Sequence, residues 1–417
     1  MLRQFNILLL TCVWLLWISP TLHGFQSESK RDPFEELRAF LELPADQRPP
    51  LEEQAFAQLN LPPAAISEAT RLLWEDRQRQ IRESRQTEME ARVIKWESRE
   101  MPFWYQVYGD APPDGRSLFI SLHGGGNGPA RMNDRQWENQ KQLYRPAEGV
   151  YVAPRAPTNT WNLWHEAHID PMFDRLIENM IVFEGVNPDR VYLLGYSAGG
   201  DGVYQLAPRM ADRFAAAAMM AGHPNEASPW GLRNLPFAIH MGENDSAYRR
   251  NEVAREWGTR LQELRADDPD GYEHLVKLHA GKGHWMDRQD AEAITWLAAK
   301  TRRTFPDRIV WFQDDVLHTR FYWLSLDPAE IRPGLKVIAR RTDQHIQVDS
   351  PELMRITIRF HPEMIDFERP VTINFNGEQV FAGRLQPTIA TLANTLRERG
   401  DKYSMYPAEI TVQRTPK

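Results

Sequence analysis

Three side chains in this sequence could act together as a nucleophile, a base and an orienting acid: Ser197, His284 and Asp245. Ser197 lies in the string Gly-Tyr-Ser-Ala-Gly-Gly at positions 195–200, directly after the apolar run 191–194. β-formers that run into a serine between glycines predict a strand, a sharp turn and a helix, with the hydroxyl exposed at the top of a sheet. Residues with a strained backbone conformation occur mostly at functional sites. The pattern therefore predicts that Ser197 is a nucleophile.

A serine nucleophile needs a base, and the base needs a carboxylate to orient it. The apolar run 237–241 leads into Gly-Glu-Asn-Asp at 242–245, and we expect Asp245 to be the acid because the strand must end before the loop can turn inward. Glu243 is the alternative. The run 275–279 leads into a glycine loop that carries His284, which we expect to be the base; His279 is still within the strand. The order Ser, Asp, His is that of α/β-hydrolase triads.

The string His-Gly-Gly-Gly at 123–126 follows another apolar run. Consecutive glycines let backbone N–H groups approach a ligand closely, so this loop could hold a developing oxyanion. We expect Gly124, Gly125 and Gly126 to form the oxyanion hole with the N–H of Ala198 at the helix start. We expect His123 to brace the loop, with no acid or base role.

The elements that would position these residues alternate between strands and helices. Expected strands are 103–108, 117–122, 150–153, 191–194, 215–220, 237–241 and 275–279, and expected helices include 172–183, 251–265 and 290–302. Several of the strands are apolar throughout, as in a parallel sheet covered on both faces. The sequence therefore predicts an α/β fold with a mostly parallel sheet flanked by helices.

The flanking regions differ from this pattern. We expect residues 1–24 to be a signal peptide, because one arginine precedes the apolar run 7–18 and small residues follow it. An uncleaved membrane anchor is the alternative. The one cysteine, Cys12, lies in that run, so the remaining chain would contain no disulfide.

Residues 25–98 read as an N-terminal helical extension with one long charged helix over 64–96, its charged face in solvent and a thin apolar stripe on the next domain. Residues 99–305 form the expected catalytic domain. Residues 306–417 read as a small C-terminal β-rich module, with strands at 336–339, 355–360, 372–375 and 380–381, a turn at Asn376-Gly377 and one helix over 389–399. We expect this module to pack or space the domains, with substrate binding as the alternative role.

The region from about 100 to 304 resembles the α/β-hydrolase superfamily, and within it the bacterial secreted carboxylesterases of the polyhydroxybutyrate-depolymerase and feruloyl-esterase-like group. The resemblance is carried by the 123–126 glycines, the 195–200 turn, the 242–245 loop and Gly283-His284. It implies ester hydrolysis through an acyl-enzyme, and it says little about the substrate because the superfamily hosts many. A peptidase or amidase with the same triad, and a non-catalytic envelope or binding protein, remain open.

Composition and aromatic residues narrow the partners. The formal net charge of −7 and the lack of a basic run argue against nucleic acid, and no His-x-x-x-His pair suggests a metal, so we expect no cofactor. The expected substrate is a small-molecule or polymer-borne ester, with a membrane partner only if the N-terminal segment is retained. Trp161, Trp164 and Trp285 could stack on sugar or aromatic rings, and Asp201 could cap the helix after the nucleophile.

Overall fold

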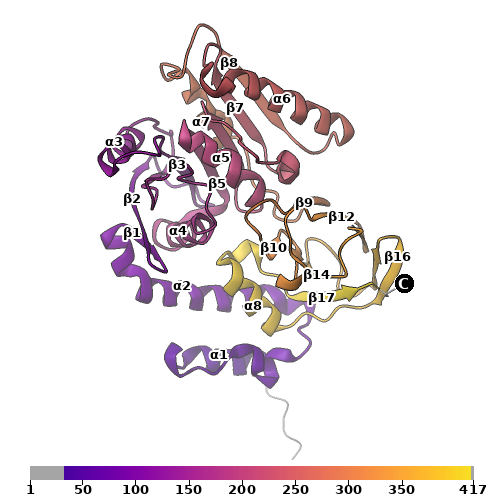
Figure 1. Ribbon diagram of the computed structural model, residues 1–417. Helices are drawn as coiled ribbons and strands as arrows, with labels where there is room; N and C mark the ends of the chain where they lie inside the picture. The colour runs from indigo at the N-terminus through magenta and orange to yellow at the C-terminus, as the bar shows by residue number, and fades with distance from the viewer. Residues whose placement is uncertain (1–31, 415–417) are drawn as a thin grey trace, which may run out of the picture.

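The computed structural model describes residues 32–414 (Figure 1). The expected signal peptide, residues 1–24, lies outside the described residues. None of the helices within residues 32–414 combines the length and the apolar character needed to cross a membrane.

One large sheet forms the centre of the expected catalytic domain. Its eight strands lie in the order β1-β2-β4-β3-β5-β6-β7-β8. The strands are β1 (Val93–Trp96), β2 (Arg99–Tyr108), β3 (Arg116–Leu122), β4 (Gly149–Pro154), β5 (Val186–Tyr196), β6 (Ala216–Met220), β7 (Phe237–Gly242) and β8 (His274–His279). β1–β2 and β2–β4 pair antiparallel, and every other neighbouring pair is parallel. This confirms the predicted mostly parallel sheet.

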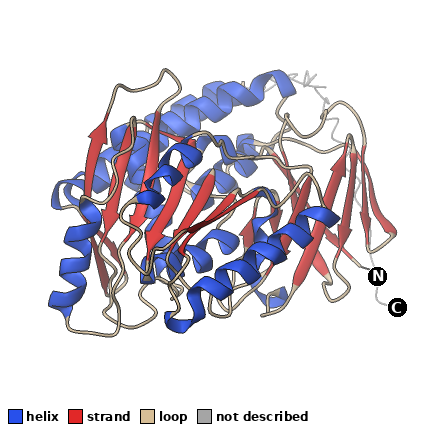
Figure 2. Cartoon of the chain, turned by 90° about the horizontal axis from the view of Figure 1, so that it is seen from above, coloured by secondary structure: helices blue, strands red, loops and turns tan. Residues whose placement is uncertain are grey.

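Alternating side chains of the strands supply two separate cores, one on each face of the sheet. On one face, residues such as Ile120 and Leu193 pack with α4 (Ile169–Glu184) and α5 (Ala198–Arg209). On the other face, residues such as Phe119 and Leu194 pack with α7 (Glu292–Ala298). Figure 2 shows helices on both sides of the strands. Burial on both faces explains why the strands are apolar throughout.

Two helix ends differ from those that the sequence predicts. The long helix ends earlier than expected: α2 spans Ile66–Ala91, Arg92 turns into the left-handed region, and the next residues form β1. β1 is an edge strand, and its pairing with β2 is a tertiary contact that helical periodicity does not reveal. The last helix, α7, ends at Ala298 and not at 302, and α3 (Ala130–Lys141) and α6 (Arg250–Asp267) complete the domain.

The N-terminal extension begins with α1 (Pro33–Glu42) and continues into α2, which lies between α1 and α4 in Figure 1. α2 buries a thin stripe that includes Leu73 and Ile81. Its charged face is not wholly in solvent as expected, because Arg77 and Arg85 both pair with Glu178 of α4 at 2.8 and 2.6 Å. The extension is therefore docked on the catalytic domain by apolar and ionic contacts.

The C-terminal module contains two small sheets, one in the order β10-β11-β14-β17 and the other in the order β16-β15-β13-β12-β9. Its elements are β9 (Arg308–Phe312), β10 (Arg320–Phe321), β11 (Leu324–Ser325), β12 (Lys336–Thr342), β13 (His345–Asp349), β14 (Arg355–Phe360), β15 (Val371–Phe375), β16 (Glu378–Gly383), α8 (Ile389–Arg399) and β17 (Ala408–Gln413). The predicted helix 389–399 and the Asn376-Gly377 hairpin turn are confirmed.

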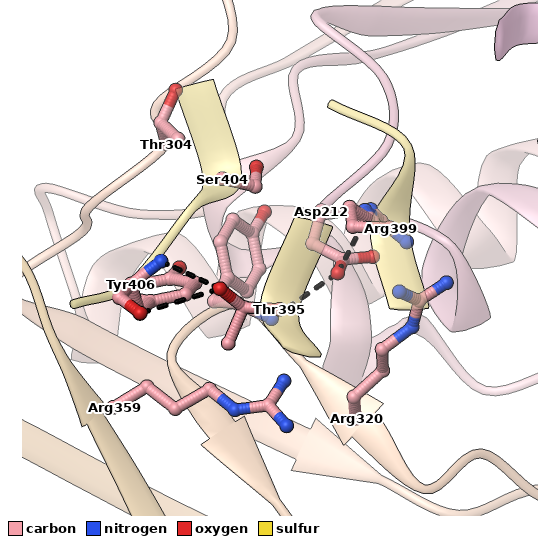
Figure 3. Close-up of a pocket in the computed structure, with 9 residues that line it drawn as sticks. Asp212, Thr304, Arg320, Arg359, Thr395, Arg399, Ser404 and Tyr406 are labelled. Atoms are coloured by element: carbon pink, nitrogen blue, oxygen red, sulfur yellow. Dashed lines mark hydrogen bonds and ion pairs between the residues drawn. The ribbon is translucent and has the colours of Figure 1, made fainter. Parts of the chain in front are cut away.

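A buried ionic network joins this module to the catalytic domain, and Figure 3 shows the part of it around Asp212 and Arg399. Arg399 of α8 lies 2.9 Å from Asp212, which follows α5. Arg302 pairs with Asp189 and with Asp401, each at 2.7 Å, and Asp401 is fully buried. Separating the module from the domain would leave these buried charges without partners, which is unfavourable. The module is thus fixed on the catalytic domain.

Candidate active site

Ser197 lies between the end of β5 and the start of α5, in the turn that the sequence predicts. Its backbone has φ 59° and ψ −124°, a strained conformation for a residue with a side chain, and its N–H donates to the Met220 carbonyl at 2.9 Å. The flanking glycines are required by close backbone contacts. A Cβ on Gly195 would lie 2.2 Å from the Gly199 carbonyl oxygen, and one on Gly199 would lie 2.2 Å from that of Leu122.

The structure brings Ser197, His284 and Asp245 together in one hydrogen-bonded chain. His284 Nε2 lies 3.0 Å from Ser197 Oγ, and His284 Nδ1 lies 2.7 Å from Asp245 Oδ2. The histidine side chain is 44% exposed, whereas that of the aspartate is 2% exposed. A buried carboxylate can hold the imidazole tautomer in which Nε2 accepts the serine proton, while the exposed ring edge can reach a substrate.

The loop at 242–245 that carries Asp245 (the acid loop) touches the loop at 280–284 that carries His284 (the base loop), and the contact is made at Gly242. A Cβ on Gly242 would lie 1.9 Å from the carbonyl oxygen of Gly283, so no other residue fits there. The base loop is also held by Tyr196, whose hydroxyl donates to the His284 carbonyl at 2.7 Å and accepts the Met286 N–H at 3.0 Å. Sequence reasoning missed this role of Tyr196; its place next to the nucleophile was the available signal.

The alternatives for acid and base lie elsewhere. Glu243 Oε2 accepts the N–H of Gly281 at 3.0 Å. His279 is buried, and its Nε2 lies 3.2 Å from Nδ1 of His240. Glu292 approaches this histidine pair, so the three residues could in geometry hold a metal ion, but Glu292 is already paired with Lys277 at 2.5 Å. None of these residues contacts Ser197 Oγ or His284.

The glycine loop lies beside the nucleophile, as predicted. A Cβ on Gly124 would lie 3.0 Å from Ser197 Cβ. The N–H of Gly126, however, donates to Asn133 Oδ1 at 2.7 Å, so it is already used within the protein. The first N–H groups of α5, including that of Ala198, have no intrahelical partner and carry the positive end of the helix dipole. Gly124, Gly125 and Ala198 are therefore the remaining oxyanion candidates.

His123 braces this loop. Its ring is fully buried, Nδ1 contacts the Gly124 carbonyl at 2.6 Å and Nε2 accepts the Ala156 N–H at 3.0 Å. Since Nε2 accepts, Nδ1 carries the proton and the ring is neutral. Burial lowers the pKa of His123 to about 4. These contacts agree with the expected structural role.

The three tryptophans have different positions. Trp161 is 56% exposed and Trp285 is 50% exposed, and each borders a cavity that reaches Ser197. Trp164 is fully buried, and its Nε1–H donates to the His123 carbonyl at 3.0 Å. The expectation that Trp164 stacks on substrate is therefore wrong, because its ring supports the glycine loop from inside the core.

Two cavities meet at Ser197. The base-side cavity, about 630 Å³, is bordered by Tyr196, Gln136, Leu143, His284, Trp285 and Arg288. The helix-side cavity, about 580 Å³, is bordered by Ala198, Trp161, Asp201, His223, Tyr248 and Arg250. Both linings combine polar and charged side chains with apolar surface, which includes the rings of Trp285 and Trp161.

Asp201 lies in the first turn of α5, where a carboxylate is favoured by the helix dipole. Its Oδ1 accepts the His223 N–H at 2.6 Å. Burial nevertheless raises its pKa to about 6. Asp201 thus has the expected cap position and also borders the helix-side cavity.

No protein-family model and no curated protein matches the chain. Among solved structures, the chain is similar to a thermostable esterase (20% identity, TM-score 0.42), with the match spanning 50% of this chain and 62% of the esterase. It is also similar to LpqC, a poly(3-hydroxybutyrate) depolymerase from Bordetella parapertussis (19%, TM-score 0.33, 48% of this chain and 89% of the depolymerase). A ferulic acid esterase matches at 14% identity and TM-score 0.33, over 48% of this chain and 92% of that enzyme.

The strand order, the turn at Ser197 and the flanking helices are those of an α/β-hydrolase fold. The predicted α/β-hydrolase fold is therefore confirmed by the chain's own topology, and the resemblance to the esterase-like group within it stays a prediction. Identities this low say nothing about the reaction or the substrate, so the function rests on this chain's own residues.

Proposed function

We propose that this chain is a serine hydrolase that cleaves carboxylic esters through a covalent acyl-enzyme. The observation that carries the proposal is the hydrogen-bonded chain from Ser197 Oγ through His284 to the buried carboxylate of Asp245, with distances of 3.0 and 2.7 Å. A serine on a strained turn, with a base in reach and an acid behind the base, is what nucleophilic acyl transfer requires.

In the proposed reaction, His284 Nε2 removes the proton of Ser197 as Oγ attacks the ester carbonyl. The imidazolium that forms is stabilised by Asp245, and the oxyanion is held by backbone N–H groups of Ala198 and of the Gly124–Gly125 segment. Each such donor contributes about 10²–10³ in rate. His284 then protonates the departing alkoxide, and water, activated by the same histidine, releases the acid and restores Ser197.

We propose esters and not amides as the natural substrates. An alkoxide leaves far more readily than an amine, so an amidase must also orient its acid toward the leaving nitrogen. Polar and charged side chains in both cavities could hydrogen-bond a hydrophilic substrate, and the exposed ring of Trp285 beside His284 offers a stacking surface for a sugar. Esters borne on saccharides outside the cytoplasm fit these features and the apolar N-terminal segment.

Changing Ser197, His284 or Asp245 to alanine is expected to lower kcat by several orders of magnitude without loss of folding. The three effects are expected to be strongly non-additive, because the residues act as a unit. Turnover of an acetylated sugar, a long-chain ester and an isosteric ester–amide pair measures the specificity.

Labelling by a fluorophosphonate probe tests the nucleophile directly, and Glu243→Ala is the matched control for the acid. An active Asp245→Ala together with an inactive Glu243→Ala would overturn the acid assignment. Equal turnover of the amide would move the protein to the amidases, and absence of labelling would favour a non-catalytic protein.

A further inference from the structure

The two cavities at Ser197 can be assigned to the two halves of an ester from the position of the base. The leaving oxygen receives its proton from His284 Nε2, so the alcohol part must lie on the side of the serine that His284 occupies. That side is the base-side cavity, which His284 and Trp285 border. The acyl part must then lie in the helix-side cavity, which His284 does not border.

The helix-side cavity contains an arginine, Arg250, that is not hydrogen-bonded to any carboxylate of the described residues. The side chain of Arg250 is only 13% exposed, yet its nearest carboxylate, Asp245 Oδ1, is 3.8 Å away, beyond hydrogen-bond distance. Its Nη1 reaches one carbonyl, that of Ala247, at 3.5 Å. Within residues 32–414 its buried Nε has no acceptor at all. A guanidinium has five donors, and leaving them unpaired away from water is costly.

Two more deeply buried arginines of this chain, Arg209 and Arg233, show how a carboxylate can satisfy a buried guanidinium. Arg209 binds both carboxylate oxygens of Asp170, at 2.6 and 3.0 Å. Arg233 binds both of those of Asp268, at 2.7 and 2.9 Å. The Arg250 side chain is somewhat more exposed and lacks this arrangement, so a planar anion such as a carboxylate in the cavity could supply it.

The backbone before Arg250 is strained, and its position at the start of α6 is unfavourable for a cation. Tyr248 and Arg249 both adopt left-handed conformations, with φ of 55° and 57°, which non-glycine residues seldom do. Arg250 is also the first residue of α6, where the helix dipole disfavours a cation and favours an anion. The Tyr248 ring holds the guanidinium in place, 4.8 Å from its centroid.

Two carboxylates lie near Arg250, that of Asp201 in the cavity wall and that of Asp245, and each has a hydrogen bond elsewhere in the protein. Asp201 accepts the His223 N–H at 2.6 Å and lies at the N-terminal end of α5. Asp245 is bound to His284. Neither carboxylate is within hydrogen-bond distance of Arg250, so its donors remain free for a ligand.

We propose that Arg250 binds a carboxylate on the acyl part of the substrate, so that the enzyme prefers half-esters of dicarboxylic acids. This inference rests on the proposed function, and it adds the chemical class of the acyl group. The carboxylate would form two parallel hydrogen bonds with the guanidinium in the helix-side cavity, while the ester carbonyl lies at Ser197.

The test compares the monomethyl ester of succinic acid with the monomethyl ester of succinamic acid, in which a carboxamide replaces the free carboxylate. The readout is the ratio of kcat/KM for the two esters, measured as acid release. Because Arg250 is 3.8 Å from Asp245, its replacement could also alter the triad, but such an effect cancels in the ratio. We expect the wild-type protein to prefer the carboxylate by about 10- to 100-fold.

Arg250→Gln is expected to abolish this preference, and Arg250→Lys is expected to retain part of it, since lysine keeps the charge and loses the planar fork. Arg255→Gln is the matched control: it removes the same charge from an exposed position of α6 and should leave the ratio unchanged.

Equal turnover of the two esters by the wild-type protein, or an equal loss of preference in Arg255→Gln, would overturn the inference and leave the proposed function intact. So would a protein that a fluorophosphonate labels but that does not turn over the carboxylate ester. A protein that is neither labelled nor active on either ester would overturn the proposed function itself.

Discussion

At the scale of single residues, two buried carboxylates near Ser197 differ in their surroundings: Asp245 is bound to His284, whereas burial disfavours the charged form of Asp201. Asp245 is buried but directly bound to His284. Asp201, four residues after the nucleophile, has its pKa raised to about 6 because burial disfavours its charged form. The charge of Asp201 should therefore lower the free energy of unfolding, and this effect can be measured.

Replacing Asp201 by asparagine is expected to stabilise the protein at neutral pH. The pKa of Asp201 is raised from 3.8 to about 6 in the folded state, so the folded state holds the proton longer than the unfolded state. Stability is therefore lost as pH rises from about 4 to 6, by about 3 kcal/mol in all. Asparagine can still accept the His223 N–H and carries no charge.

Urea unfolding of wild type and Asp201→Asn at pH 4 and pH 7.5 measures this effect. The variant should gain stability at pH 7.5 and little at pH 4. A gain of the same size at both pH values would show that ionisation of Asp201 is not the cause.

At the scale of elements, the catalytic geometry depends on two loops held at fixed positions above the sheet. The acid loop follows β7 and the base loop follows β8, and these strands are parallel neighbours. Gly242 allows the loops to touch, and Tyr196 at the end of β5 fastens the base loop through its hydroxyl. Rigid strands thus set the distances within the triad.

Tyr196→Phe is expected to lower kcat about tenfold or more while changing KM little. The ring stays in place, but the backbone of His284 and Met286 loses its two hydrogen bonds, and small displacements of a base are expensive in rate. Tyr192→Phe is the control, since its hydroxyl donates to the Lys300 carbonyl at 2.8 Å, away from the triad. Equal kinetics of both variants would show that the Tyr196 hydroxyl does not position the base.

At the scale of the whole molecule, the three regions of the chain pack as one body. α2 of the extension contacts both the catalytic domain and α8 of the C-terminal module. The module carries none of the triad residues, and its interface with the catalytic domain is a buried ionic network. These contacts favour a packing role for the module.

Asp401→Asn is expected to destabilise the whole protein by about 3–5 kcal/mol, because it removes a partner from the buried Arg302. Asp343→Asn, which breaks an exposed pair with Arg369 in the same module, should have little effect. Thermal unfolding of both variants, together with turnover of a small ester, makes the comparison. A stable Asp401→Asn protein with altered specificity would instead support a binding role for the module.

Acid should unfold the protein earlier than its carboxylates alone would predict. Burial lowers the pKa of His123, His240 and His361 to about 4 each. Between pH 6.5 and 4 the unfolded chain binds protons at these positions and the folded chain does not. Stability is therefore lost as pH falls through this window, by as much as about 1.4 kcal/mol per pH unit for each histidine.

His361→Asn is expected to flatten this loss, measured as the free energy of unfolding at pH 7, 6 and 5. His361 stacks on Phe305 at 4.2 Å and lies far along the chain from the triad, so activity at neutral pH should persist. An unchanged pH dependence would show that His361 does not titrate in this range.

Features that depend on local spacing could be predicted from the sequence. The triad was predictable because a parallel sheet places the carboxyl ends of its strands at one edge. Ser197 lies between glycines directly after one apolar run, and Asp245 and His284 follow two other runs within a few residues. The helix over 389–399 and the turn at Asn376-Gly377 were predictable for the same local reason.

Features that depend on partners distant in the sequence could not be predicted from local patterns and are seen only in the folded chain. Trp164 and Trp161 are equally plausible stacking residues in sequence, but the first lies under the His123 loop and the second in a cavity wall. Gly126 is indistinguishable from Gly124 until Asn133 is seen to occupy its N–H. Arg250 is one arginine among many until its burial and its missing carboxylate are known. Burial and pairing are properties of the packed chain, and local sequence patterns do not encode which distant side chain supplies them.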